Sequence, residues 1–394
     1  MVHSNVPSAH RCRELVGGHL RTAVPRGPHE ERPEKRMRGG RLRTKTVGSW
    51  LKRSVMVSLA VALPLGASVA GPIAAPASAA FNPDGFDFWV DSEMGPIKNR
   101  IFRAADGNTA RVVYALDGMR ARDDLNGWEI DTEVARSLTA ANINVVMPVG
   151  GQSSFYADWN APSNFFGLDA GSGGSSTGSA ATGSAMTGSS IAPAQVAGKK
   201  NTYKWETFIT RDLRNALSSR LGFSPNRNGV FGLSMGGSAA LTLAAYNPDQ
   251  FSFAGSFSGY LNISAPGMRE AMRVAMISAG GFNIDAMAPP WGPQWLRMDP
   301  FVFAPRLVAN NTRLWISAAS GIPGAGDISN PMEIVQGVPL EVLAMANSRA
   351  FQVRMLTLGG GNATFDFPLT GVHNWRNWQD EVNRMIPDLS ANIG

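Results

Sequence analysis

A serine between two glycines, preceded by an apolar run and followed by strong helix formers, constrains this chain more than any other stretch. The motif is Gly232-x-Ser234-x-Gly236, and residues 228–233 form the apolar run. This order predicts a strand, a sharp turn and a helix, the layout of a nucleophile elbow. The backbone around such a serine leaves no room for Cβ atoms two residues away, so glycine is expected at both positions. The helix then points its first amides at the serine, and the Met235 N–H is a candidate donor to a developing oxyanion.

The first 79 residues have the composition of a targeting leader. A basic stretch precedes an apolar run at residues 55–70, and small residues follow up to Ala79. Charged, apolar and small zones in this order predict a secretory signal peptide cleaved near Ala79. Pro64 interrupts the apolar run, which makes a permanent membrane span less favourable. The residues before Met37 fit neither a domain nor a signal peptide, and Met37 is an alternative start.

The leader also carries the positive charge of the chain. Residues 1–79 contain 13 of the 36 Lys and Arg and four of the 30 Asp and Glu, so residues 80–394 hold 23 basic and 26 acidic side chains, a net charge of −3. The basic character that would favour a nucleic-acid partner is therefore confined to the leader, and we expect no such partner. Residues 80–394 are long enough for a single α/β domain with insertions.

Cysteine and histidine are almost absent from residues 80–394. The one cysteine, Cys12, lies in the leader together with four of the five histidines, and His373 is the remaining one. Disulfides, thiol chemistry and a histidine-rich metal site are excluded on these counts, and we expect no metal or other cofactor. A serine hydrolase needs one imidazole base, and His373 supplies it.

The apolar segments follow the pattern of an α/β fold. We expect an opening antiparallel hairpin and then a mostly parallel central sheet flanked by helices, the arrangement of an α/β-hydrolase. The expected strands are residues 88–90, 99–103, 111–116, 142–148, 228–233, 251–258, 313–317 and 351–358, with helices near 330–347 and over 375–386. Residues 167–198 are almost wholly Gly, Ser, Ala and Thr, which predicts a disordered insertion within the fold.

A methionine stripe follows the sixth of these expected strands, residues 251–258. Met268, Met272 and Met276 recur every four residues, which indicates one face of a helix. Ordinary core packing is the simpler interpretation. The functional alternative is a soft, adaptable wall for a long apolar ligand.

A catalytic triad in this fold appears in the order serine, acid, histidine. Ser234 and His373 fit that order, and His373 lies before a closing helix. The acid has three candidates between the late strand and the expected last strand: Asp327, Glu333 and Glu341. Position alone favours Asp327, and any of the three is equally consistent with a solvated surface residue.

Several further segments resemble the antigen 85 family, the secreted mycolyltransferases of mycolic-acid bacteria. Together they cover nearly all of residues 80–394 in order, and jointly they are highly specific. The matching stretches are residues 116–128 (LDGMRARDDLNGW), 147–156 (MPVGGQSSFY), 203–208 (YKWETF), 232–237 (GLSMGG), 309–315 (ANNTRLW), 365–368 (FDFP) and the pair His373 and Trp375.

The resemblance implies an acyl-transfer mechanism. Ser234 would take a mycoloyl group from trehalose monomycolate as an acyl-enzyme, with His373 as the base. The family's acid lies in a Phe-Leu-Glu-Gly segment whose counterpart is residues 339–342, so the resemblance moves the expected acid from Asp327 to Glu341. The Met119 and Met235 amides match the family's oxyanion donors.

The resemblance also implies a sugar pocket and a cellular setting. Asp117, Arg120, Ser258 and Trp375 match positions that line the trehalose pocket, although Asp117 also suits a turn and Arg120 a surface charge. The expected partners are trehalose mycolates and glycolipid or polysaccharide acceptors of the cell wall. The expected location is outside the cell, with peripheral contact with the cell envelope.

Three departures from the family pattern concern the acceptor. They are the insertion at residues 167–198, Arg122 in place of a glutamine, and Ala318 in place of a cysteine near the site. The acceptor stays open between trehalose monomycolate, arabinogalactan and a protein hydroxyl. Two other functions compete: a secreted carboxylesterase, and a non-catalytic wall-binding or matrix-binding relative without the triad.

Overall fold

An eight-stranded sheet runs through the part of the chain that the computed structural model describes, which is residues 84–163, 202–328 and 331–394. Its spatial order is β1-β2-β4-β3-β5-β6-β7-β8. The strands are β1 (Phe86–Val90), β2 (Ile97–Phe102), β3 (Val112–Leu116), β4 (Asn144–Pro148), β5 (Asn228–Leu233), β6 (Phe251–Phe257), β7 (Arg313–Ser317) and β8 (Ala363–Asp366).

The opening hairpin is antiparallel and the rest of the sheet is parallel. β1 pairs with β2, and β2 with β4, in antiparallel register, and each pair from β4 through β8 is parallel. The central parallel strands β3, β4 and β5 are buried on both faces, which explains why they read as nearly continuous apolar runs rather than alternating ones. Their carboxyl ends meet along one edge, where Leu116 lies beside Gly232 and Leu233 beside Phe257.

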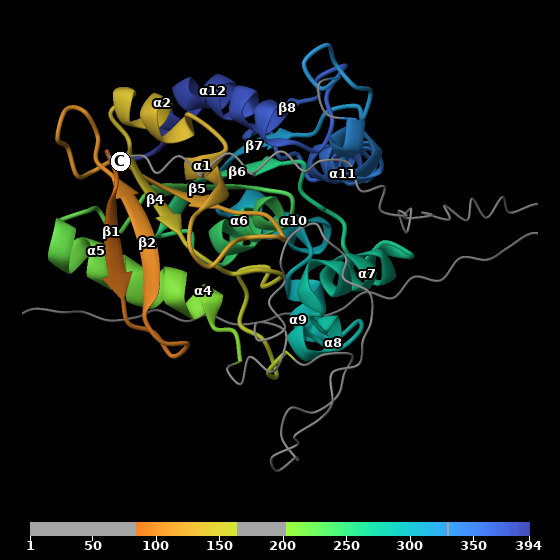
Figure 1. The fold of residues 1–394 in the computed structure, drawn as a ribbon, viewed down its shortest axis with the longest axis horizontal. Coiled ribbons are helices and arrows are strands. Elements are labelled where there is room, and N and C mark those ends of the chain that lie inside the picture. The colour runs from red at the N-terminus through yellow and green to blue at the C-terminus, as the bar shows by residue number, and fades with distance from the viewer. Residues whose placement is uncertain (1–83, 164–201, 329–330) are drawn as a thin grey trace, which may run out of the picture. The chain divides into compact units, whose positions relative to one another are not determined.

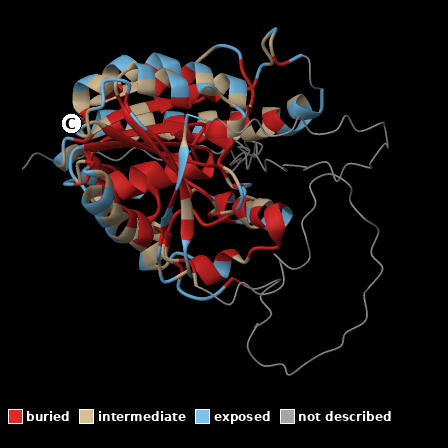
Figure 2. Ribbon diagram, turned by 60° about the vertical axis from the view of Figure 1, so that its left-hand side comes forward, coloured by how far each residue is buried: buried red, intermediate tan, exposed pale blue. Residues whose placement is uncertain are grey.

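Helices cover both faces of this sheet (Figure 1). Their bounds are α1 (Gly127–Ile130), α2 (Val134–Ala140), α4 (Trp205–Thr207), the π-helical turn η2 (Phe208–Leu213), α5 (Arg214–Leu221), α6 (Met235–Tyr246), α7 (Met268–Gly280), α8 (Ile284–Met287), α9 (Pro293–Arg297), α10 (Pro300–Ala309), α11 (Pro331–Thr357) and α12 (Trp375–Asn392). One buried cluster joins α6 and α10 to the sheet, and a second joins α2 and α12 to the other face. Figure 2 shows the centre of the sheet as buried, in keeping with the wholly buried β3, β4, β5 and nearly all of α6.

The expected α/β-hydrolase architecture is confirmed, and one expected strand is wrong. Residues 351–358 do not form the last strand: α11 continues through Thr357, and the last strand is β8, a short segment that was not among the predicted strands. Apolar residues occupy alternate positions there, but their burial does not alternate. Phe351 and Met355 are buried, whereas Val353 is 60% exposed, a period of four rather than two.

Other expectations are settled only in part. The methionine stripe lies on α7, and Met268, Met272 and Met276 all pack in the core, as the simpler interpretation holds. The leader at residues 1–79 and the whole insertion at residues 167–198 lie outside the described residues. Over the described ranges, no helix combines the length and apolar character needed to cross a membrane.

Candidate active site

The nucleophile elbow forms at the carboxyl end of β5. Ser234 has φ 51° and ψ −119°, a strained conformation between the strand and α6, and its N–H donates to Phe257 O at 2.8 Å. The flanking glycines are required by contact. A Cβ on Gly232 would lie 2.5 Å from the Gly236 backbone, and one on Gly236 would lie 2.4 Å from Asp117 O. The predicted strand–turn–helix is therefore present, with the serine at the first turn of α6.

His373 and Glu341 form a close pair on neighbouring segments. The His373 Nδ1 lies 2.9 Å from Glu341 Oε2, and the glutamate side chain is 1% exposed. His373 lies in the loop before α12, whereas Glu341 lies inside α11. The two segments are held together by the His373 N–H, which donates to Gly337 O at 3.4 Å. This pairing leaves Nε2 of the imidazole available as a proton acceptor.

Glu341 is held by two further donors. The Ser258 hydroxyl donates to Oε1 at 2.8 Å, and the Ala319 N–H donates to the same oxygen at 2.6 Å. Ser258 in turn accepts from the Trp378 Nε1–H at 2.9 Å. A buried carboxylate that accepts several hydrogen bonds is fixed in position. Trp378 and the Ala319 amide had no signal in the sequence.

The other two candidate acids have different surroundings. Asp327 is buried, and its oxygens accept from the Gly324 N–H at 2.8 Å and from the Asn374 side-chain amide at 2.9 Å. It therefore braces the loop that precedes α12. Glu333 is exposed on the first turn of α11. Of the three, Glu341 is the one that contacts His373.

Tyr260 connects the serine and the histidine. Its phenol ring is stacked on the His373 ring with centroids 6.5 Å apart, and its hydroxyl is close enough to the Ser234 side chain to interact by a hydrogen bond. Burial raises the pKa of this phenol. The structure records no direct hydrogen bond between the Ser234 hydroxyl and the His373 ring. Such bonds are often long before substrate binds.

The loop after β3 approaches the elbow from the other side. A Cβ on Gly118 would lie 3.9 Å from the Ser234 Cβ, so the start of this loop lies beside the serine, and Met119 is the next residue. Met235 begins α6 directly after Ser234. These two backbone N–H groups are thus placed on the two segments from which an oxyanion hole is usually built.

Asp117 organises this loop. Its carboxylate accepts from the Gly118 N–H at 2.6 Å and from the Gly127 N–H at 2.8 Å. Burial raises the pKa of Asp117 to about 6, although these two amide donors oppose the shift. Trp375 lies against Gly127, where a Cβ would be 2.3 Å from the indole ring. Arg120 is exposed at the same loop. Asp117 and Trp375 are therefore neighbours across Gly127, and Ser258 is only 2% exposed.

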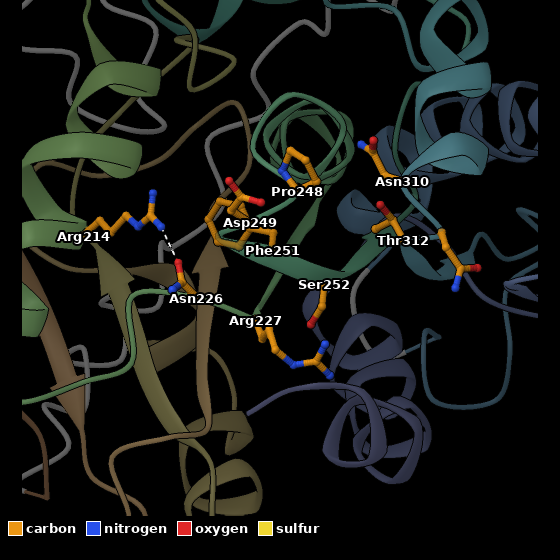
Figure 3. Close-up of a pocket in the computed structure, with 10 residues that line it drawn as sticks. Arg214, Asn226, Arg227, Pro248, Asp249, Phe251, Ser252, Asn310 and Thr312 are labelled. Atoms are coloured by element: carbon orange, nitrogen blue, oxygen red, sulfur yellow. Dashed lines mark hydrogen bonds between the residues drawn. The ribbon is translucent and has the colours of Figure 1, made fainter. Parts of the chain in front are cut away.

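Two cavities lie at opposite edges of the sheet. The larger, about 560 Å³, is at the amino ends of β5, β6 and β7, where Arg227, Asp249 and Thr312 line it (Figure 3). That edge is opposite to the elbow, so this cavity is not the candidate active site. The smaller, about 300 Å³, has Ser258 and Glu341 in its wall. Over the described residues, no group of three or more His, Cys, Asp or Glu side chains is placed to hold a metal ion.

Comparison with known proteins gives a consistent result. Residues 96–180 and 174–389 match the family described as a putative esterase. A diacylglycerol acyltransferase/mycolyltransferase Ag85B of Mycolicibacterium smegmatis is 36% identical over 363 residues, which cover 89% of this chain and 98% of that protein. The Ag85B protein of Mycobacterium avium is 39% identical over 290 residues, covering 73% and 77%.

Solved structures agree on the fold. MPT51 (FbpC1) of Mycobacterium tuberculosis superposes with a TM-score of 0.61 at 29% identity, covering 79% of this chain and 99% of that one. An S-formylglutathione hydrolase of Agrobacterium tumefaciens has a TM-score of 0.50 at 16% identity, covering 80% and 97%, a likeness that concerns the fold alone.

Proposed function

We propose, from the premise that the chain belongs to the antigen 85 acyltransferases within the putative esterase family, that it transfers a mycoloyl group between sugar hydroxyls through an acyl-enzyme on Ser234. The chain is an acyltransferase by this membership. The proposal concerns which residues act and on which substrates. The observation that carries it is the 2.9 Å contact of His373 with the buried Glu341, beside a serine on a strained elbow.

The first half of the reaction forms the acyl-enzyme. His373 Nε2 takes the Ser234 proton as the serine oxygen attacks the ester carbonyl of the donor, and Glu341 stabilises the imidazolium through Nδ1–H. The Met119 and Met235 amides donate to the oxyanion. The imidazolium then gives its proton to the departing sugar oxygen, the C–O bond of the donor breaks, and the acyl group stays on Ser234.

The second half transfers the acyl group to an acceptor. A sugar hydroxyl gives its proton to His373 and attacks the serine ester, and Ser234 is regenerated when it regains that proton. Asp117, Arg120 and Trp375 are proposed to position the sugar, since they share the loop-and-helix edge beside the serine. Ser258 also belongs to the proposed pocket by resemblance, although its hydroxyl is committed to Glu341.

The substrates and the location follow from the same membership. We propose trehalose monomycolate as donor, and trehalose monomycolate or cell-wall arabinogalactan as acceptor. Residues 1–79 are proposed to direct export, with cleavage near Ala79, and residues 80–394 to act at the cell envelope as one domain. Hydrolysis of simple esters is the lesser alternative, because the curated relatives carry acyltransferase names.

Acyl transfer by the purified protein tests the proposed function, and Ser234→Ala is the decisive variant. Given a long-chain acyl trehalose donor and trehalose, the wild-type protein should form diacyl product, and Ser234→Ala should lower kcat roughly 10⁴-fold or more with folding preserved. Ser278→Ala, an exposed serine on α7, is the matched control and should behave as wild type.

Mass spectrometry of protein trapped with the donor should show one acyl adduct on the peptide that contains Ser234. Product that appears only as free acid would favour an esterase instead. Full turnover by the Ser234→Ala variant would show that Ser234 is not the nucleophile.

A further inference from the structure

The loop that follows β4, residues 149–157, has a strained backbone to which the acyl-transfer mechanism gives no role. Within it, φ is positive at Gly150 (104°), Gly151 (85°), Ser153 (55°), Phe155 (53°) and Tyr156 (46°). Residues with a side chain rarely adopt this region, and three of them do so here within four positions. A backbone of this kind persists only where its surroundings hold it in place, so its contacts indicate what the loop does.

Two hydrogen bonds join this loop to the two residues whose amides are the proposed oxyanion donors. The Ser153 N–H donates to Met119 O at 3.0 Å. The Phe155 N–H donates to Met235 Sδ at 3.2 Å, although Met235 lies 80 residues further along the chain. The segment after β3 and the first turn of α6 are therefore both held by one loop.

A third contact makes Tyr156 the central side chain of this support. Its hydroxyl accepts from the Asp117 N–H at 3.0 Å and donates to Gly150 O at 3.5 Å. The residue is 1% exposed, and its ring packs edge-on against Trp205 with centroids 5.4 Å apart. Tyr156 thus ties the residue after β3 to the loop, and packing fixes Tyr156 itself.

These contacts restrain the peptide groups on both sides of the Met119 Cα. The preceding peptide is held through Gly118 O, which accepts from the Ala121 N–H at 3.1 Å. In a trans peptide the C=O and N–H point in opposite directions, so the Met119 N–H is directed away from Ala121. The following peptide is held through Met119 O by Ser153. Oxyanion donors are effective when they are oriented before the reaction begins, which is what such restraint provides.

We infer that the loop at residues 149–157 preorganises the oxyanion hole and that Tyr156 is its principal positioning residue. Tyr156 acts through the backbone at Asp117 and does not contact the substrate. The inference rests on the proposed function for the place of the oxyanion, and it adds a residue outside the triad on which the rate of ester cleavage depends.

The probes are 4-nitrophenyl octanoate and the corresponding thionoester, in which sulfur replaces the carbonyl oxygen, each given to the purified protein. Tyr156→Phe keeps the ring but leaves the Asp117 N–H without its acceptor. We expect kcat/KM for the ester to fall about tenfold, the order of one lost hydrogen bond. For the thionoester it should change by less than about twofold, because charge develops on sulfur, a weak acceptor that gains little from aligned donors.

Met235→Leu is the second variant, because it conserves volume and the backbone N–H and removes only the sulfur that Phe155 contacts. It should lower the ester-to-thionoester ratio about threefold, since the lost acceptor is a weak one. Tyr114→Phe is the matched control. Tyr114 is also 1% exposed, but its ring packs on Phe251, so the ratio should stay as in wild type.

Equal losses on the two substrates would show that the loop supports only the fold, and would overturn the inference. An unchanged ratio in Tyr156→Phe would overturn it as well, and if that variant does not fold, the ratio in Met235→Leu decides. If the ratios change as expected but wild-type protein transfers no acyl group to a sugar hydroxyl, the support of the oxyanion hole stands and the proposed function fails. Unchanged ratios in a protein that does form diacyl trehalose would remove the inference and leave the proposed function intact.

Discussion

Ser258 is the residue whose position adds most to the chemistry of the site. It has a positive φ of 51°, a strained value for a serine, and its hydroxyl links Trp378 to Glu341. A side chain that substrate must reach is rarely so enclosed. Its geometry favours positioning of the acid, whereas the family resemblance places it in the sugar pocket.

We expect Ser258→Ala to lower kcat about 10- to 100-fold with little change in the KM for trehalose. The variant removes one hydrogen bond to a charged carboxylate, worth roughly 1.5–3 kcal/mol, and frees Glu341 to move away from His373. Steady-state kinetics with varied trehalose separates the two roles. Ser256→Ala is the control, since that buried hydroxyl has no hydrogen-bond partner in the described part of the chain. A raised KM with unchanged kcat would show that Ser258 binds sugar instead.

Asp117 gives the site a defined pH dependence of stability. Its pKa of about 6 in the folded protein lies above its ordinary value of 3.8, so the folded state binds this proton more tightly than the unfolded state does. The stabilisation from the protonated form is complete below about pH 4 and is lost as the pH rises through 6. The shift corresponds to roughly 3 kcal/mol.

We therefore expect Asp117→Asn to remove that dependence. The difference in unfolding free energy between wild type and variant should change by up to about 3 kcal/mol between pH 4 and pH 7, in the direction that wild type loses stability as pH rises. Urea unfolding at several pH values measures it, with Asp249→Asn as an exposed control. A difference that is constant with pH would contradict the raised pKa.

At the scale of elements, α11 is where sequence reasoning failed and where the acid lies. Residues 351–358 contain apolar residues at alternate positions, a pattern that predicts a strand. The helix that begins at Pro331 extends through them because Phe351 and Met355 complete a buried face with Ala344 and Ser348. Position along the chain favoured Asp327 over Glu341. A single sequence does not show which acidic side chain of a long helix points toward the core. Glu341 was reached through resemblance rather than spacing.

The helical assignment predicts unequal costs for neighbouring substitutions. Phe351→Ala should lower the unfolding free energy by about 3–4 kcal/mol, because it empties a fully buried aromatic site. Val353→Ala should change it by less than about 0.5 kcal/mol, because Val353 is 60% exposed. Chemical denaturation of both variants tests this. Comparable losses would fit a strand, in which residues 351 and 353 share one face.

At the scale of the whole fold, what was predicted and what was missed have different physical origins. The buried parallel strands, the elbow at Ser234 and the lone His373 have local signals: apolar runs, obligatory glycines and the absence of any other base. β8 has no such signal, since its four residues are only half-buried. The link from Trp378 through Ser258 to Glu341 depends on three segments meeting in space, which no single-sequence pattern records.

The opening hairpin is tied to the site by a buried ion pair. Arg100 on β2 and Glu129 on α1 both have side chains with 0% exposure, and Arg100 Nη2 lies 2.8 Å from Glu129 Oε1. Arg100 also pairs with Asp87 on β1 at 2.8 Å. α1 begins at Gly127, whose N–H binds Asp117, so the pair connects the edge of the sheet to the proposed sugar loop.

Removing one charge of this pair should lower the unfolding free energy more than removing both charges. Glu129→Leu leaves Arg100 buried without its main partner and should lower the unfolding free energy by about 3–5 kcal/mol, whereas Arg100→Met with Glu129→Leu should recover most of that loss. A double-mutant cycle by urea unfolding measures the coupling. Single and double costs that simply add would mean that the two charges are stabilised independently, by Asp87 and by the α1 backbone. In that case the hairpin would contribute nothing through this pair to the loop that holds Asp117.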